Sequence, residues 1–145
     1  MPNWVNNRVT IVGSAETIKR LVEANMDFEV LRPRPKEMED QWYNWNVEHW
    51  GTKWNRVDYE VFSQKKKKLE CSFDTAWSPP TAFFDHLLDL YHDLWIKCEW
   101  DEEGDTAGVW VAHWKDDILV KSSTMWEEHY SSMYDHESEE EEESN

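Results

Sequence analysis

Tryptophan is concentrated in one short segment of this 145-residue chain. Residues 42–54, WYNWNVEHWGTKW, hold four of the eleven tryptophans, and Gly51 interrupts the segment just before Lys53. Indole rings stack on flat ligands and attract cations over their faces. The backbone amides of Gly51 and Thr52, next to the Lys53 charge, are suited to an anion. The segment therefore predicts an aromatic recess that binds a flat ligand or a partner protein.

A second segment, TAWSPP at residues 75–80, lies between an expected strand and an expected helix. Free amides at a helix N-terminus bind anions, but Pro79 and Pro80 have no amide hydrogen. The stronger interpretation is a rigid corner in which Trp77 packs on Trp50 or Trp54. The candidate ligand- or partner-binding residues of both segments and their flanks are Trp45, Trp50, Thr52, Lys53, Trp54, Asp74, Trp77 and Ser78.

The same rings also have a purely structural interpretation, which the composition favours. Aromatic residues make up 14% of a chain that is only 39% hydrophobic. Each buried ring removes on the order of 150–250 Å² from water, so a few rings can supply most of a small core. In this case the segment is a lid on the core, and a binding site exists only if the lid leaves a gap.

Metal binding is not expected from the spacing of acidic residues and histidines. His86, Asp89 and Asp93 share one helical stripe, but it lies opposite the apolar stripe and faces water. The acidic turn at 101–105 lacks the glycine and glutamate positions of a calcium loop.

Catalysis is not marked by any motif either. Cys71 and Cys98 are too few and too distant for a zinc site, and they are expected to be small core residues. Nucleophile-elbow and phosphate-loop motifs do not occur, and the chain has four glycines in all. We expect no metal, cofactor or catalytic residue. The weakest functional hypothesis is an enzyme that uses Asp74 or Asp101.

The formal net charge of −16 favours basic partners. Residues 135–145 contain seven acidic residues and no Lys or Arg, and the rest of the chain is still acidic. Such a field repels nucleic acid and anionic lipid surfaces. The four lysines at 65–68 are expected to be a solvated turn, and residues 69–73 lack the RNA-recognition pattern. With no hydrophobic leader and no apolar run long enough to span a bilayer, we expect a cytoplasmic protein that binds neither membrane nor nucleic acid.

Hydrophobic periodicity predicts the elements that position these residues. Strands are expected at 7–12, 57–62, 69–74, 95–101, 108–115 and 118–121, and helices at 16–24, 37–50 and 81–94. Thr124 and Glu127 form a capping-box pattern. It predicts a short amphipathic helix within residues 123–134 that carries Trp126, Tyr130 and Met133. Residues 135–145 are expected to be a disordered acidic tail.

Side-chain alternation also predicts which residues face the core. In the first hairpin the inward sets are Val57, Tyr59 and Val61 on one strand and Leu69, Cys71 and Phe73 on the other. In the helix that follows, the apolar stripe consists of Phe83, Leu87, Leu90, Tyr91 and Leu94.

This order of elements predicts an α+β fold of the ferredoxin-like βαββαβ type, an antiparallel sheet with the helices on one face. It forms a single domain over residues 1–122. A Trp-rich helical insertion at 32–55 follows the first helix, and an extra hairpin closes the C-terminal side.

Four motifs resemble those of a known family. MPNW at 1–4 with Asn7, WGTKW at 50–54, TAWSPP at 75–80 and DEEGDTAG at 101–108 are similar to the YubB-type ferredoxin-like domain proteins of phages and plasmids. The resemblance extends to about Lys121 and leaves out the acidic tail. Val5 departs from the pattern, because family members often have cysteine there. The resemblance implies a ferredoxin-like fold without an iron–sulfur cluster, carriage on mobile elements, and no established activity or catalytic residues.

Two functional hypotheses of different classes follow. The first is a non-enzymatic accessory protein of a phage, plasmid or virus, which acts in the host cytoplasm and binds a basic protein partner through its acidic surface and Trp-rich face. The alternative is a small-ligand protein that holds a nucleotide-like molecule in the recess beside Lys53.

Overall fold

A computed structural model describes the fold of residues 3–127. It is a mixed α+β structure with one six-stranded antiparallel sheet and four α-helices. In chain order the elements are β1 (Trp4–Val12), α1 (Ala15–Glu23), α2 (Phe28–Leu31), the 3-10 helix η1 (Lys36–Gln41), α3 (Trp42–His49), β2 (Val57–Lys65), β3 (Lys68–Ala76), α4 (Thr81–Leu90), β4 (Trp95–Glu102), β5 (Thr106–Lys115) and β6 (Ile118–Glu127).

The first strand of the chain lies inside the sheet, whose strand order is β2-β3-β1-β4-β5-β6. Val9 of β1 has Cys71 of β3 as its partner on one side and Cys98 of β4 on the other. In β1 every second residue is buried, including Val5, Val9 and Ile11, as the alternation predicts. β1 thus joins the two halves of the sheet.

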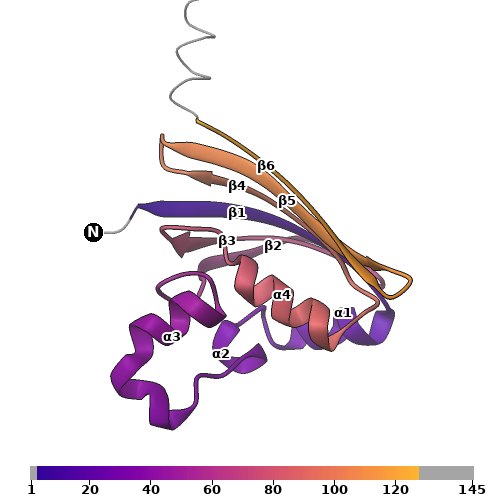
Figure 1. The fold of residues 1–145 in the computed structure, drawn as a ribbon. Coiled ribbons are helices and arrows are strands. Elements are labelled where there is room, and N and C mark those ends of the chain that lie inside the picture. The colour runs from indigo at the N-terminus through magenta and orange to yellow at the C-terminus, as the bar shows by residue number, and fades with distance from the viewer. Residues whose placement is uncertain (1–2, 128–145) are drawn as a thin grey trace, which may run out of the picture.

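The helices cover one face of the sheet, and the core lies between the two layers (Figure 1). Ser14 caps α1 by accepting a hydrogen bond from the Thr17 backbone N–H at 3.2 Å. Ile18 and Leu21 of α1 are buried, as are Phe83 and Leu87 of α4. The other face of the sheet has no helix over it in the described part of the chain.

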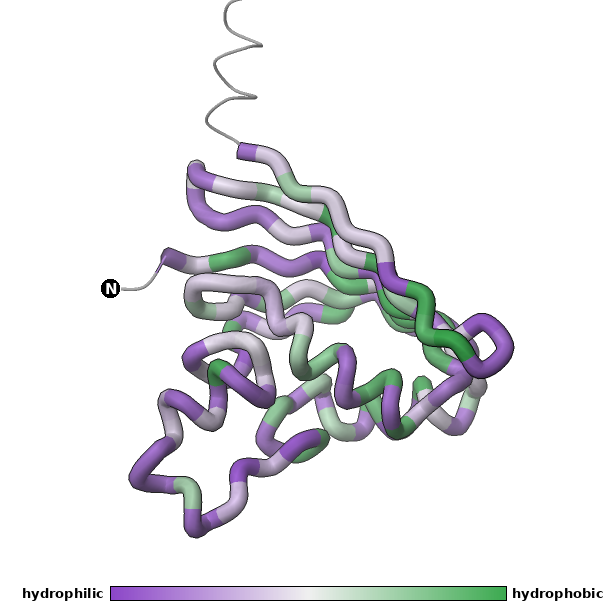
Figure 2. Tube along the Cα trace, viewed as in Figure 1, coloured by the Kyte–Doolittle hydropathy of each residue, from purple (hydrophilic) through white to green (hydrophobic). Residues whose placement is uncertain are grey.

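The insertion between α1 and β2 forms a lobe of its own. Figure 2 shows it as largely hydrophilic, in contrast to the greener strands and α4. The single helix expected at 37–50 is instead η1 followed by α3. Pro35 precedes η1, and no residue of η1 is buried, so packing does not select the regular helix there. After α3, Gly51 takes φ +82° and turns the chain toward α4.

β2 departs from the expected alternation because it is bulged. The register with β3 shifts twice, and Asp58 has φ +53°. Only Tyr59 of the expected inward set packs on the core, whereas Val57 and Val61 are exposed. On β3, which is regular, the expected Leu69, Cys71 and Phe73 are all buried.

α4 is shorter than the helix expected at 81–94. It ends at Leu90, which is 55% exposed, because Tyr91 is already extended. Leu94 is still buried, but it reaches the core from the loop before β4.

The helix expected around Thr124 is wrong, because β6 continues through this position to Glu127. Thr124 pairs with Val109 and Trp126 with Ala107 in an unbroken register with β5. The capping-box pattern is a local signal, and ten consecutive pairs with β5 outweigh it. Tyr130, Met133 and the tail at 135–145 lie outside the described residues.

No helix in residues 3–127 combines the length and apolar character that a bilayer crossing requires.

Candidate functional site

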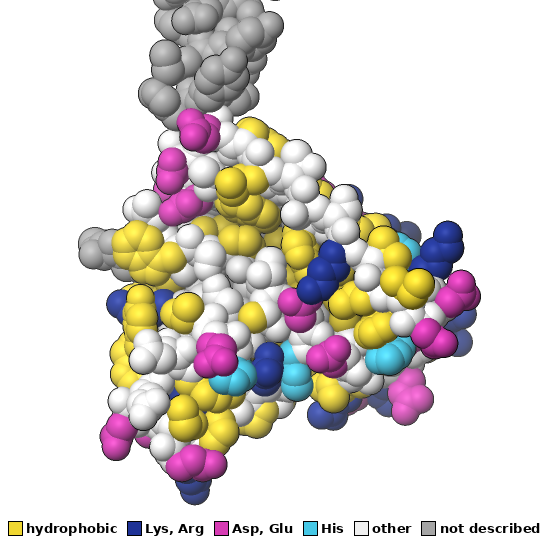
Figure 3. All heavy atoms as spheres, viewed as in Figure 1, with side chains coloured by type: hydrophobic (Ala, Val, Ile, Leu, Met, Phe, Trp, Pro, Cys, Tyr) yellow, Lys and Arg dark blue, Asp and Glu magenta, His cyan; other side chains and the backbone are white. Residues whose placement is uncertain are grey.

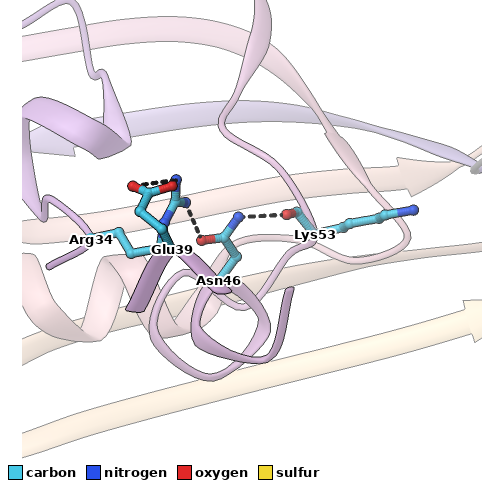
Figure 4. Close-up of polar contacts among 4 residues, drawn as sticks. All are labelled: Arg34, Glu39, Asn46 and Lys53. Carbon is cyan, nitrogen blue, oxygen red and sulfur yellow. Dashed lines mark hydrogen bonds and ion pairs between the residues drawn. The ribbon is translucent and has the colours of Figure 1, made fainter. Parts of the chain in front are cut away.

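The insertion lobe is organised around a buried amide, that of Asn46 on α3. Its Nδ2 donates to the Lys53 carbonyl at 2.8 Å, and its Oδ1 accepts from Arg34 Nη1 at 2.9 Å. Arg34 Nη2 in turn reaches Glu39 of η1 at 3.4 Å, so the row runs from η1 to the turn after α3 (Figure 4). Asn46 is 2% exposed, which makes these bonds costly to lose.

Trp45 and Trp50 serve as core rings in this lobe. Trp50 is 1% exposed, packs edge-on against Phe28 at 5.8 Å, and donates from Nε1 to the Arg32 carbonyl at 3.0 Å. Trp45 lies perpendicular to Trp50 and stacks on His49 at 4.4 Å. The Trp-rich segment therefore closes on the core and buries these two rings, and Trp50 offers no open stacking face.

Thr52 and Ser78 turn their hydroxyls inward. Thr52 Oγ1 donates to the Ala76 carbonyl at 2.7 Å, and Ser78 Oγ donates to the Gly51 carbonyl. The Phe83 backbone N–H of α4 donates to the Trp50 carbonyl at 3.3 Å. These bonds join the two predicted segments, 50–54 and 75–80, and their groups hold the fold together rather than facing a ligand.

Lys53 and Trp54 remain near the surface. Lys53 Nζ lies over the Trp54 ring at 4.6 Å and over the Tyr43 ring at 5.7 Å. Figure 4 shows its side chain pointing away from Asn46. Trp54 also contacts Trp4, with ring centroids 5.9 Å apart. Lys53 and Trp54 thus form an aromatic surface together with Tyr43 of α3 and Trp4 of β1.

Trp77 and Asp74 do not join this surface. Trp77 is 50% exposed with φ +75°, and among residues 3–127 its ring pairs with neither Trp50 nor Trp54. The predicted packing of Trp77 on these rings is therefore wrong, because Trp50 packs on Phe28 and Trp45 instead, and Trp54 packs on Trp4. Asp74 accepts from Asn6 Nδ2 at 3.0 Å.

A hollow of about 450 Å³ opens on the insertion side of the sheet. Its walls combine aromatic rings, two arginines and two amides. They are formed by Glu29, Arg34, Trp42, Asn46, Trp50, Trp54, Asn55, Arg56 and Val57. Arg34 is mostly buried, and its Nε has no hydrogen-bond partner within the described residues. Arg56 donates to the Asn25 carbonyl from Nε at 3.1 Å and Nη2 at 3.0 Å.

Sequence patterns identify part of this hollow only. Trp50 and Trp54 are among the predicted residues, whereas Arg34, Asn46 and Arg56 are not. The alternation Arg32-Pro33-Arg34-Pro35 was a usable signal, since prolines on both sides hold an arginine in an extended, fixed position.

The helix-free face of the sheet carries paired charges. Lys68 meets Glu70 at 3.0 Å, and Lys97 meets Glu99 at 3.1 Å. Arg8 lies over the Phe62 ring at 5.2 Å. On the face in Figure 3, acidic side chains are likewise scattered and interspersed with basic ones.

The residues considered for metal and thiol chemistry lie apart. Within residues 3–127, no three His, Cys, Asp or Glu side chains are grouped closely enough to hold a metal ion. Asp93 instead accepts from the Ser14 backbone N–H at 2.8 Å and from Thr17 Oγ1 at 3.3 Å, beside the start of α1. Burial raises the pKa of the Cys71 thiol to about 12, and it also raises the pKa of Cys98. Both thiols are therefore protonated at neutral pH.

Comparisons with known proteins add no relative. No protein-family model matches the chain, and neither a curated protein nor a solved structure does.

Proposed function

We propose that this protein is a non-enzymatic binding module that captures a basic segment of a partner protein on the insertion lobe. The observation that carries the proposal is the outer side of α3. There Trp42, Tyr43 and Val47 are 38%, 49% and 44% exposed on a helix that projects from the sheet layer. Large apolar side chains gathered on a surface favour an interface. We call these three residues the α3 surface.

Charge defines the chemistry of the partner. Glu39, Asp40 and Glu48 flank the α3 surface in the sequence, and the whole chain has a net charge of −16. The lobe already places cations over its rings, because Lys53 lies over Tyr43 and Trp54. An arginine or lysine of a partner could likewise lie over the rings of Trp42 and Tyr43, with the carboxylates of the flanking acidic residues nearby in the sequence.

Two further features of the proposal rest on the fold and on the motifs. The strand order β2-β3-β1-β4, with α1 after β1 and α4 after β3, supports a ferredoxin-like unit to which β5 and β6 are added. The motif resemblance supports an accessory role on a phage or plasmid, in the host cytoplasm.

The charge pairs Lys68–Glu70 and Lys97–Glu99 favour a protein over a nucleic acid as partner, since each pair neutralises a lysine on the open face.

Peptide binding tests the proposal. Arg/Lys-rich peptides that contain one aromatic residue are titrated into the labelled protein, with Asp/Glu versions of the same peptides as controls. We expect only the basic set to bind, with affinity falling as salt rises. The double variant Trp42→Ala/Tyr43→Ala should weaken binding at least about tenfold, as expected for aromatic hot-spot residues.

A matched control uses another exposed apolar residue. Val30 is 57% exposed and outside the α3 surface, so Val30→Ala should bind like the wild type. Equal binding of acidic and basic peptides, or unchanged binding by the double variant, would refute the proposal.

A second candidate function is a small-ligand site in the hollow of about 450 Å³. Its specific support is the combination of Arg34 and Arg56 with the rings of Trp42 and Trp54, which suits a flat, anionic, nucleotide-like molecule. A thermal-shift screen with nucleotides tests it. A saturable rise that Trp54→Ala abolishes and Trp77→Ala retains would support the site, because Trp77 is exposed but does not line the hollow.

A further inference from the structure

The two edges of the sheet differ in how they are protected. At one edge, β2 has two register shifts and a residue with φ +53°, and lysines follow it. Bulges and lysines are the usual devices that prevent an edge from pairing with another strand. At the other edge, β6 runs through ten residues in unbroken register with β5 and is the outermost strand of the sheet (Figure 1). No described residue pairs with its outer side.

β6 also exposes apolar side chains at both of its ends. Ile118 and Val120 are 69% and 38% exposed near the start, and Met125 and Trp126 are 66% and 45% exposed near the end. Between them lie Lys121, Ser122, Ser123 and Thr124. The strand thus reads apolar–polar–apolar in either direction, which suits pairing with its own copy in antiparallel orientation.

We propose that β6 is the dimerisation strand of this protein and pairs with β6 of a second copy about a twofold axis through Ser122. Residues that face each other across an antiparallel pair point to the same side of the sheet. In this register Ile118 faces Trp126 of the second copy, and Leu119 faces its Met125. Ser122 faces itself. Cross-strand apolar pairs then form on both faces of a continuous twelve-stranded sheet.

The side-chain directions on β6 agree with this register. Lys121 reaches Asp85 of α4 at 2.6 Å, so the odd-numbered residues of β6 face the helices and the even-numbered ones face away. A twofold axis through Ser122 places odd-numbered residues of one copy opposite odd-numbered residues of the other, and even-numbered residues opposite even-numbered ones. The helices of both copies therefore lie on one side of the joint sheet.

Charge opposes the association and gives it a measurable signature. Each chain carries −16, and Asp117 faces Glu127 of the second copy at the rim of the proposed interface. Screening removes this repulsion, so the dimer is stronger at about 0.5 M salt than at about 0.05 M. Pairing with a basic partner would depend on salt in the opposite direction.

The test is the solution mass by light scattering over micromolar to millimolar protein, at both salt concentrations. The wild type should approach twice the 17.5 kDa of one chain, and more readily at high salt. In the variant Val120→Lys/Ser122→Lys/Thr124→Lys, lysine faces lysine at three pairs, and dimerisation should weaken at least about tenfold. The corresponding triple glutamate variant should weaken it as well, while an equimolar mixture of the two variants should form a heterodimer.

The variants carry their own controls. All three positions are on the side of β6 away from the helices, and circular dichroism checks that the variants fold. The lysine variant is less negative than the wild type, so a general effect of net charge would strengthen its association. Gln64→Lys on the opposite edge strand should leave the mass unchanged. A wild type that stays monomeric throughout, a triple variant that dimerises like the wild type, or a mixture without heterodimer would each overturn the proposal.

Discussion

Asn7 is a polar residue in the middle of an otherwise apolar strand face. It is fully buried, and its Nδ2 lies 2.9 Å from Thr75 Oγ1, 3.2 Å from the Val5 carbonyl and 3.3 Å from the Phe73 carbonyl. A buried amide with its partners in place fixes the register of the strands it joins. Here it fixes β1 against β3.

Replacement of Asn7 by alanine should therefore destabilise the protein strongly. The change removes these bonds and leaves a small cavity, so we expect a loss of about 2–3 kcal/mol in the free energy of unfolding. Urea denaturation measures this value. Asn6→Ala is the control, because Asn6 is exposed and donates only to Asp74; it should cost less than about 1 kcal/mol. Equal losses in the two variants would contradict the role of Asn7.

Asp93 couples stability to pH at the start of α1. Burial acts to raise its pKa, but hydrogen bonds from Ser14 and Thr17 outweigh this and lower the pKa below its ordinary value. A carboxyl group with a lowered pKa in the folded state stabilises the protein above its unfolded pKa. This contribution is lost as pH falls through the folded value.

Asp93→Asn should thus lower the melting temperature at neutral pH, by an amount that corresponds to at most about 1 kcal/mol. The difference from the wild type should shrink as pH falls from neutral, and it should disappear only below the lowered folded-state pKa of Asp93, where both side chains are neutral. Thermal melts across this range give the measurement. Asp89→Asn, an exposed residue of α4, is the control. A difference that stays constant with pH would show that the charge of Asp93 is irrelevant.

At the scale of the elements, Gly51 joins the insertion to α4. It has φ +82°, and a Cβ atom at this position would lie 3.1 Å from the Ala82 backbone nitrogen and 3.2 Å from that of Thr81. Glycine is thus needed for both its backbone conformation and its lack of a side chain.

Gly51→Ala should destabilise the protein by about 2–3 kcal/mol, from the positive φ and the close contact together. Gly104→Ala separates the two effects. Gly104 has φ +68° but nothing within 4 Å of an added Cβ, so its substitution should cost only about 1 kcal/mol. Chemical denaturation of both variants provides the comparison. If the two losses are equal, the insertion does not dock closely on α4.

The elements that were predictable from sequence are those with one buried face. β1, β3 and β4 show the alternation that burial imposes, and their positions match the expected strands. The edge strands were less predictable, because bulges in β2 and exposure in β6 break the pattern. Local signals were misleading where long-range pairing decides the structure, as at Thr124.

The candidate site was also predictable from sequence only in part. The importance of the Trp-rich segment was visible in the composition, and Trp54 with Lys53 does lie at the surface. Which rings become core was not predictable, since that depends on Phe28 from another part of the chain. Arg34 and Asn46 form their bonds only after the insertion has folded back on itself.

At the scale of the whole molecule, the apolar core lies between the sheet and the helices within residues 3–127. Deletion of residues 135–145, which are almost entirely acidic or polar, should therefore leave the melting temperature within about 2 °C of the wild type. Differential scanning calorimetry measures this. A chain that also lacks β6 is the comparison, and it should melt several degrees lower because β5 loses its partner. A similar drop from the tail deletion alone would show that the tail packs on the body.

The central place of β1 also governs how the chain can assemble as it is synthesised. β1 is made before its partners β3 and β4, which end only at Ala76 and Glu102. In a growing chain β1 therefore lacks its sheet partners, and its apolar face stays uncovered, until most of the domain has been synthesised. Closing such distant pairs makes folding slow compared with helical proteins of similar size. During that interval the apolar face of β1 is a surface that a chaperone would protect.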